Sequence, residues 1–378
     1  MSLSAYVHIP FCTHKCEFCD FAAFAGLSHL ETEYCQIVCQ EIDQRDTSDI
    51  LSRKLDSVFY GGGTPGLITI SNLSLIHNRL LEKFGTNENC EVNLETTPHA
   101  ITSEKVKGWI DLGINRLSIG VESFQDDELK AIGRDHTRKQ AYDGIATALE
   151  NGVENISLDL MYGLPTQSLD SWKNSLNQLF ELSAAHPQIK HFSSYGLHLA
   201  NNSPLYSKFP KDSSHYPGDQ SHEEMFLLLL ETAREAGFQH YEVSNFCKPG
   251  HQSRHNLSYW NNSEYLAYGV SAHRYLGGVR SSNWRSIAAY MKDYLGCETS
   301  EKIDRETRMK EAIMLGLRLR KGLDLVDFET CFGVSLLDKF EEPIERLTEG
   351  GFVEIENDFL RITDRGVLVS NSIIAELF

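Results

Sequence analysis

Three cysteines near the start of the chain have a spacing that suits metal chemistry. Cys12, Cys16 and Cys19 follow the pattern C-x3-C-x2-C. Three thiolates can hold a cubane iron–sulfur cluster, and the iron without a cysteine is then open to another ligand. A structural zinc ion has four ligands, and His14 lies too close in sequence to the cysteines to act as the fourth with relaxed tetrahedral geometry. A disulfide would leave one of the three cysteines unpaired. The spacing favours an iron–sulfur cluster, with zinc or no metal as the open alternatives.

Polar residues at the ends of predicted strands suggest a ligand beside these cysteines. The glycine run Gly61–Pro65 could present backbone groups to a ligand or form a tight turn. Glu95 and Asp159 interrupt strand patterns, where a carboxylate could hold an ammonium group or form a buried structural pair. Arg134 could bind a carboxylate in bidentate fashion or lie on the surface. A ligand with an amine, a carboxylate and ribose hydroxyls beside an open iron matches S-adenosylmethionine (SAM), a radical cofactor.

Short apolar runs alternate with helical patterns up to about residue 246. This alternation predicts βαβ units and a parallel sheet. Six repeats fit an α/β fold with a partial, TIM-like (β/α)6 barrel, whose active groups lie at the C-terminal ends of the strands. The predicted strands are Ala5–Ile9, Ser57–Tyr60, Glu91–Thr96, Arg116–Val121, Ile156–Tyr162, His191–Leu197 and Tyr241–Ser244, and the predicted helices lie near 29–45, 70–84, 103–112, 126–150 and 168–183.

The remainder of the chain has a different pattern. Residues 200–221 are predicted to form a long loop over the barrel mouth. Further on, the pattern predicts helices at Arg305–Arg320, Leu323–Cys331 and Ser335–Glu349, followed by a hairpin over 352–362. We therefore divide the chain into a barrel with the cofactor site (1–246), a basic extension (247–294) and a small α+β domain similar to a winged helix (295–378).

Charge limits the partners that the chain can have. The 378 residues carry a net charge of −18, which argues against nucleic acid, and four glutamates crowd the helix that would read DNA. Residues 248–292, in contrast, hold six Lys or Arg and one acid, Glu264. This stretch predicts an anionic small ligand, unless its charges are fortuitous and paired elsewhere.

The sequence also indicates a compartment. No apolar stretch reaches the length of a membrane span, and no basic segment followed by an apolar one opens the chain. The six cysteines outside the motif are scattered, as in proteins of a reducing cytoplasm. We expect a cytoplasmic protein without a transmembrane segment, with peripheral membrane contact left open.

Taken together, the motifs resemble one family. The chain is similar, over nearly its whole length, to radical SAM proteins of the oxygen-independent coproporphyrinogen III oxidase-like family. The resemblance rests on Tyr6–Cys12 (YVHIPFC), Gly61–Pro65 (GGGTP), Gly120–Phe124 (GVESF), Leu158–Pro165 (LDLMYGLP), Tyr241–Phe246 (YEVSNF), Lys248–Gly250 (KPG) and His255–Trp260 (HNLSYW).

The resemblance implies a set of cofactor ligands. Cys12, Cys16 and Cys19 would bind a [4Fe-4S] cluster, and an electron donor such as a flavodoxin or ferredoxin would reduce it. Glu122 stands where the family usually has glutamine; a carboxylate can accept a ribose hydrogen bond but cannot donate one. The residues that would surround SAM are Tyr6, Phe18, Gly62, Gly63, Thr64, Glu95, Glu122, Arg134, Asp159 and Gly196.

The family contains both enzymes and carriers. The decarboxylating oxidases have a further cysteine two positions after the last cluster ligand, where this chain has Phe21, and a longer segment before the cluster than the eleven residues here. Both differences match the sister group regarded as haem chaperones, which bind haem and pass it to acceptor proteins. We expect a haem chaperone; the alternative is oxygen-independent coproporphyrinogen III oxidase, an enzyme of porphyrin biosynthesis that decarboxylates propionates through a radical.

Candidate haem contacts lie in and after the basic HNLSYW motif. His255 could offer a nitrogen to haem iron, while Tyr259 and Trp260 could pack on the macrocycle. His273 could face either SAM or the haem. The alternative is that His255 and Trp260 form a packing motif under the barrel, and the oxidases share this motif. Three basic side chains could meet the propionates: Lys248, Arg254 and Arg274.

Overall fold

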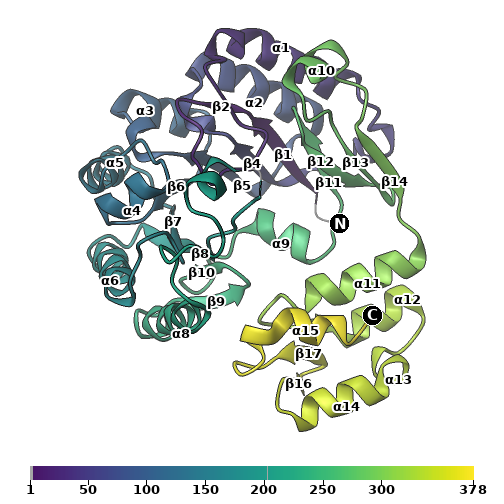
Figure 1. Ribbon diagram of the computed structural model, residues 1–378. Coiled ribbons are helices and arrows are strands. Elements are labelled where there is room, and N and C mark those ends of the chain that lie inside the picture. The colour runs from purple at the N-terminus through teal and green to yellow at the C-terminus, as the bar shows by residue number, and fades with distance from the viewer. Residues whose placement is uncertain (1–2, 202) are drawn as a thin grey trace.

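The computed structural model describes residues 3–201 and 203–378, and its main feature is a mixed sheet of twelve described strands (Figure 1). The six central strands are parallel and follow one another in sequence order, with helices on their outer face, which confirms the partial (β/α)6 barrel. The central strands are β1 (Ser4–Ile9), β4 (Leu55–Gly62), β5 (Thr86–Thr96), β6 (Arg116–Glu122), β7 (Ile156–Tyr162) and β8 (Ile189–Gly196), and the helices between them are α1 (Glu31–Gln44), α2 (Ile70–Phe84), α3 (Ser103–Asp111), α4 (Asp126–Ala131), α5 (Arg138–Glu150) and α6 (Leu169–Ala185).

The sheet continues beyond the barrel on both sides. Beside β8 lie two antiparallel strands, β10 (Asn245–Cys247) and β9 (Gln239–Glu242). On the other side, β11 (Tyr265–Tyr268) runs parallel to β1, with Ser4 opposite Tyr265. Three antiparallel strands then extend the sheet: β12 (His273–Leu276), β13 (Val279–Ser282) and β14 (Thr299–Lys302). Much of the segment 247–294 is thus built onto the barrel sheet, and the division at residues 246 and 294 stays a prediction.

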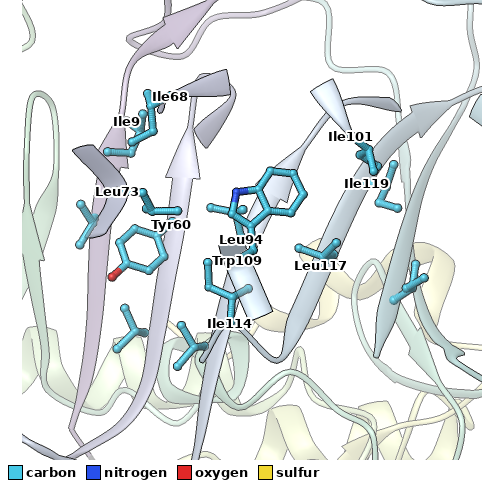
Figure 2. Packing of buried hydrophobic residues seen from close by; sticks show 14 of the residues in the cluster. Ile9, Tyr60, Ile68, Leu73, Leu94, Ile101, Trp109, Ile114, Leu117 and Ile119 are labelled. Atoms are coloured by element: carbon cyan, nitrogen blue, oxygen red, sulfur yellow. The ribbon is translucent and has the colours of Figure 1, made fainter. Parts of the chain in front are cut away.

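Apolar side chains fill the space between the sheet and its outer helices (Figure 2). Helix α2 illustrates why: Thr69 caps its first turn by accepting a backbone N–H, and Gly85 ends it with a φ of 67°. Between these ends, Leu73, Ile76 and Leu80 recur at helical spacing and are fully buried. Each such side chain stabilises the fold by roughly 1.5–3 kcal/mol.

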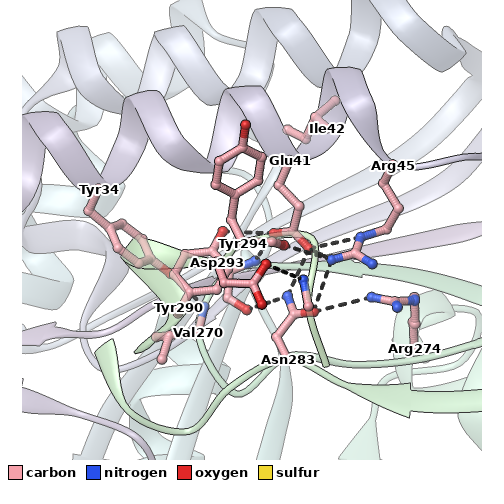
Figure 3. A network of polar contacts seen from close by, with 12 residues as sticks. Tyr34, Glu41, Ile42, Arg45, Val270, Arg274, Asn283, Tyr290, Asp293 and Tyr294 are labelled. Carbon is pink, nitrogen blue, oxygen red and sulfur yellow. Dashed lines mark hydrogen bonds and ion pairs between the residues drawn. The ribbon is translucent and has the colours of Figure 1, made fainter. Parts of the chain in front are cut away.

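A buried polar network joins α1 to the segment after β11 (Figure 3). The carboxylate of Glu41 is completely buried and forms an ion pair of 2.7 Å with Arg45. It also accepts hydrogen bonds from Asn283 (2.8 Å), the Tyr290 hydroxyl (2.7 Å) and the N–H of Gly269 (2.8 Å). Glu41 therefore fixes the strands of the extension against the barrel.

Several predicted elements are wrong in their limits. The expected helix 126–150 is divided into α4 and α5, because the chain turns at Gly133 with a φ of 71°. The expected strand Tyr241–Ser244 contains the turn between β9 and β10. The expected loop 200–221 contains α7 (Pro204–Lys208) and the start of α8 (Asp219–Glu235), a long helix that the sequence interpretation missed.

The C-terminal region has a hydrophobic core of its own, which includes Met309, Ile313, Phe328 and Leu360. Its α+β composition and its hairpin agree with the prediction, although Leu323 begins a short strand rather than a helix. No helix of the described residues is long and apolar enough to cross a bilayer. Helix α10 (Ile287–Lys292) precedes this region. The elements of the region are α11 (Arg305–Gly316), β15 (Leu323–Asp324), α12 (Leu325–Phe332), α13 (Leu336–Lys339), α14 (Glu341–Glu349), β16 (Val353–Glu356), β17 (Phe359–Ile362) and α15 (Ser370–Ala375).

Candidate functional site

Most of the predicted cofactor residues meet at the C-terminal ends of the parallel strands. They line one hollow, which we call the thiol cavity, together with the three cysteines. Gly196 lies instead in an adjoining barrel cavity of ≈470 Å³, which shares Phe18, Cys19, Glu95 and Asp159 with the first. Tyr6 lines a third cavity, which borders neither Gly196 nor the glycine run. The predicted residues in the thiol cavity are Cys12, Cys16, Cys19, Phe18, Gly62, Gly63, Thr64, Glu95, Glu122, Arg134 and Asp159.

The cysteines lie on a loop that leaves the short strand β2 (Phe11–Cys12). Within a turn of this loop, the N–H of Cys19 donates a hydrogen bond to the carbonyl of Cys16 at 3.1 Å. Thr64 donates its hydroxyl to the Cys12 sulfur at 3.7 Å, and Arg134 donates to the Cys16 sulfur at 3.2 Å. Burial raises the pKa of Cys12 to about 11 and also raises the pKa of Cys16 and Cys19. The thiols are thus protonated unless a metal displaces their protons.

The arrangement of the thiols differs from that of a single-ion site. Among the described residues, no three His, Cys, Asp or Glu side chains are grouped so that they could hold one metal ion. The three thiols nevertheless border one cavity, next to hydrogen-bond donors from Thr64 and Arg134. Ligands of a cluster bind separate irons, so they have no need to converge on one point.

The glycine run packs against the segment that precedes the cysteines. A β-carbon on Gly62 would lie 2.5 Å from the His8 ring, and one on Gly63 would lie 2.7 Å from the Pro10 carbonyl carbon. Gly62 also has a φ of 113°, which favours glycine. Its N–H donates to Glu95 at 3.1 Å. Close packing therefore explains these two glycines, and it brings the glycine run to the cavity wall.

Three carboxylates come from the neighbouring strands β5, β6 and β7; Glu122 is buried, and Glu95 and Asp159 are half-buried in the cavity wall. Burial, followed by the charge of Asp159, raises the pKa of Glu95 to about 8. Burial and the charge of Glu122 raise the pKa of Asp159 to about 7, and burial also raises the pKa of Glu122. Raised carboxyl pKa values of this kind mark a site that lacks positive charge.

Arg134 supplies a counter-charge to one of the three carboxylates, Glu122. Its guanidinium lies 3.7 Å from Glu122 and donates to the carbonyl of Gly120 at 2.5 Å. Its Nε is buried and has no hydrogen-bond partner among the described residues. The site can therefore accept one cationic group between the carboxylates and one acceptor at Arg134. An amino acid with an additional positive charge, such as SAM, has this combination, so the residues present fit both the cluster and SAM.

Glu122, which departs from the family's usual glutamine, has an unusual backbone. Its φ of 64° lies in the left-handed region, at a bulge where β6 changes register against β7. The Tyr195 hydroxyl donates to its carboxylate at 2.9 Å. The sequence interpretation missed Tyr195, although alternation along β8 places it on the same face as His191 and Ser193, and all three line the barrel cavity.

The four haem candidates do not line a single cavity. His255 is 1% exposed, and its ring nitrogens bond to Ser57 at 3.0 Å and to the Tyr259 hydroxyl at 2.8 Å. Trp260 borders a separate cavity against the C-terminal region. Tyr259 and His273 share the third cavity, of ≈630 Å³, with Tyr6. We call this third cavity the side cavity.

The basic stretch is also dispersed in space. Lys248 donates to a carbonyl at the end of α8, and Arg254 donates to the carbonyl of Asn89. Arg274 donates to the Asn283 side chain beside the Glu41 network (Figure 3). Arg280 and Arg285, in contrast, border the side cavity together with His273.

Comparisons with known proteins agree with this architecture. Residues 6–179 match the model of the radical SAM superfamily, and residues 303–369 match that of the HemN C-terminal domain. A solved structure titled coproporphyrinogen III oxidase (HemN) from Escherichia coli, a radical SAM enzyme, is superposed with a TM-score of 0.86. The alignment covers 100% of this chain and 90% of that one at 22% identity, which supports a common fold.

Curated relatives define the family more narrowly. A Bacillus subtilis protein named heme chaperone HemW is 34% identical over 98% of this chain and 97% of its own length. A Haemophilus influenzae protein of the same name is 33% identical over 100% of this chain and 97% of its own. The fold and the site define a radical SAM protein with a HemN-like C-terminal domain. Within that class, the chain belongs to the family of the proteins named heme chaperone HemW.

Proposed function

We propose that this protein is a haem chaperone that binds a [4Fe-4S] cluster, SAM and haem, and delivers haem to acceptor proteins. The observation that carries the proposal is the full-length similarity to proteins named heme chaperone HemW. Phe21 supports it, because the resembling oxidases have a cysteine at this position. A small redox protein as electron donor and a cytoplasmic location belong to the same proposal.

In this proposal, Cys12, Cys16 and Cys19 hold the cluster and the carboxylate group holds SAM. When bound, a reduced cluster supplies an electron to the sulfonium of SAM. Glu95 and Asp159 would receive the positively charged part of SAM, and the free Nε of Arg134 would donate to its carboxylate. Tyr195 would orient Glu122, because it donates to that carboxylate at 2.9 Å.

The alternative function is that of an oxygen-independent coproporphyrinogen III oxidase. The structural likeness to HemN concerns the fold and therefore does not separate an oxidase from a carrier. The two proposals differ in their products: an oxidase releases carbon dioxide and protoporphyrinogen, whereas a chaperone releases haem unchanged.

One experiment distinguishes the two. The cluster is reconstituted anaerobically in the full chain, and reductant, SAM and coproporphyrinogen III are added. We expect no protoporphyrinogen above the level of a Cys12→Ser/Cys16→Ser/Cys19→Ser control. Haem is then loaded on the protein, and its transfer to apomyoglobin is followed by absorption. Catalytic formation of protoporphyrinogen, or failure to bind haem, would overturn the chaperone proposal.

A further inference from the structure

The side cavity joins three parts of the chain that are distant in sequence. The loop after the cysteines contributes Asp20 and Phe21, and the β12–β13 hairpin with its following loop contributes His273, Arg280 and Arg285. Helix α11 closes the far wall with Glu311, Met314 and Leu315. Its volume of ≈630 Å³ lies within the range of about 300–1,000 Å³ that is usual for sites of cofactor-sized ligands.

This cavity adjoins the cysteine site directly. Phe21 borders the side cavity, the thiol cavity and the barrel cavity, and Asp20 borders two of them. The Phe21 side chain is 64% exposed, although Phe is a residue type that is usually buried. Together with Met314 and Leu315, it offers apolar surface to a ligand that enters the cavity.

The two histidines of the cavity wall differ in their hydrogen bonds. His8 is buried, and its ring nitrogens bond to the Tyr6 hydroxyl and to the carbonyl of Ala22, both at 3.0 Å. His273 is exposed, and its ring forms no hydrogen bond within the described part of the chain. A neutral imidazole with free nitrogens is a common iron ligand. His273 can therefore coordinate a metal without the loss of an existing bond.

Two arginine side chains in the cavity wall could bind anionic groups of a ligand. Arg285 is exposed and donates one N–H to the carbonyl of Asp20 at 2.7 Å, so most of its donors point to solvent. Arg280 is bound by Glu311 through two contacts of 2.6 and 2.8 Å, which tie the hairpin to α11. An anion in the cavity would meet Arg285 first, while Arg280 becomes available only if Glu311 releases it.

We propose that the side cavity is the haem site of this chain, with His273 as iron ligand, Phe21 against the macrocycle and Arg285 at a propionate. The proposal rests on the proposed haem-carrier function and makes it specific. It assigns the iron to His273 rather than to His255, whose two nitrogens are already bonded within the barrel. It also places the haem next to the cluster loop, with Phe21 between them.

The test is a titration of ferric haem into full-length, cluster-reconstituted protein, followed by Soret absorption and magnetic circular dichroism. We expect His273→Ala to weaken binding by about tenfold or more, since even the outer partners of metal ligands have effects of this size. Its iron spectrum should change and should be restored by added imidazole. His29→Ala, which removes another exposed histidine, is the matched control and should bind as the wild type does.

The outcomes separate this inference from the broader proposal. If wild-type protein binds no haem, the haem-carrier function itself fails. If His273→Ala keeps the wild-type affinity and spectrum, the assignment to the side cavity fails while the carrier function stands. Phe21→Ala and Arg285→Gln provide a second check, because both lie on the surface and their folding is easily verified; each should weaken haem binding without change in the iron ligand spectrum. Wild-type affinity in both would also overturn the assignment.

Discussion

Two regions of buried carboxylate in this chain have opposite surroundings. Glu41 is satisfied by four groups of the protein, among them the guanidinium of Arg45 (Figure 3). On neighbouring barrel strands, Glu95 and Asp159 lie near a third carboxylate, Glu122, which alone of the three forms an ion pair with Arg134, and the pKa values of Glu95 and Asp159 rise to about 8 and about 7. The first region completes its own bonds and supports the fold. The second leaves Glu95 and Asp159 without a basic partner of their own among the described residues, so a cationic ligand can supply the missing positive charge.

The largest effect should follow from removal of Glu41. Glu41→Ala leaves the guanidinium of Arg45 without its buried anionic partner, so we expect a loss of about 3–5 kcal/mol in the free energy of unfolding. Urea denaturation followed by circular dichroism measures this loss. Glu33→Ala removes an exposed glutamate of the same helix and should change stability little. Equal effects of the two substitutions would contradict the structural role of Glu41.

Asp159 should behave in the opposite manner. Asp159→Asn removes a charge that burial already disfavours, so stability should not fall. The affinity for SAM should fall by about tenfold, the value of one charge-assisted hydrogen bond. Calorimetric titration of SAM into reconstituted protein is the measurement, with the exposed Asp170→Asn as control. A loss of stability without loss of SAM affinity would assign Asp159 to a structural pair.

The pH dependence of stability should identify Glu95. With a folded pKa of about 8 and an unfolded pKa of about 4, Glu95 holds a proton in the folded chain that the unfolded chain has lost. Its contribution is therefore complete below about pH 4 and is lost as the pH rises through about 8. Buried histidines such as His255 act in the other direction, so the difference between wild type and Glu95→Gln is the readout. A difference that does not vary with pH would contradict the raised pKa.

The smallest effect concerns Glu122. Its charge is one cause of the raised pKa of Asp159, so Glu122→Gln should lower that pKa. A carbon-13 titration of labelled Asp159 by nuclear magnetic resonance checks the direction, and Tyr195→Phe controls for loss of the neighbouring hydroxyl. An unchanged or raised pKa of Asp159 would show that the two carboxyls do not interact.

The sequence predicted the elements whose signals are local. Strand Ile156–Tyr162 and helix 70–84 agree with the structure at both ends, because apolar alternation and a Thr–Gly pair of caps mark them. Helix α8 was missed within a polar stretch. The pairing of β11 with β1 joins residues more than 250 positions apart, and no local pattern encodes it.

The candidate site was predictable to a similar degree. Glu95 and Asp159 could be found because a charge inside an apolar strand is costly. Tyr195 was missed because tyrosine is common in strands and carries no such signal. Within the residues that the structure describes, both ring nitrogens of His255 are hydrogen-bonded, whereas those of His273 are not. This difference depends on neighbours from other strands, such as Ser57, and cannot be predicted from sequence spacing.

The position of β1 in the sheet has a consequence for the order in which the chain folds. β1 lies between β4 and β11, so one of its edges stays unpaired until residues 265–268 have been synthesised. Closure of so long a loop is slow, and domains fold from the N-terminus during translation. The cysteine loop, which leaves the sheet directly after β1, is therefore completed late. Iron–sulfur assembly on this protein should accordingly follow synthesis of residues 265–268 rather than accompany synthesis of the first strands.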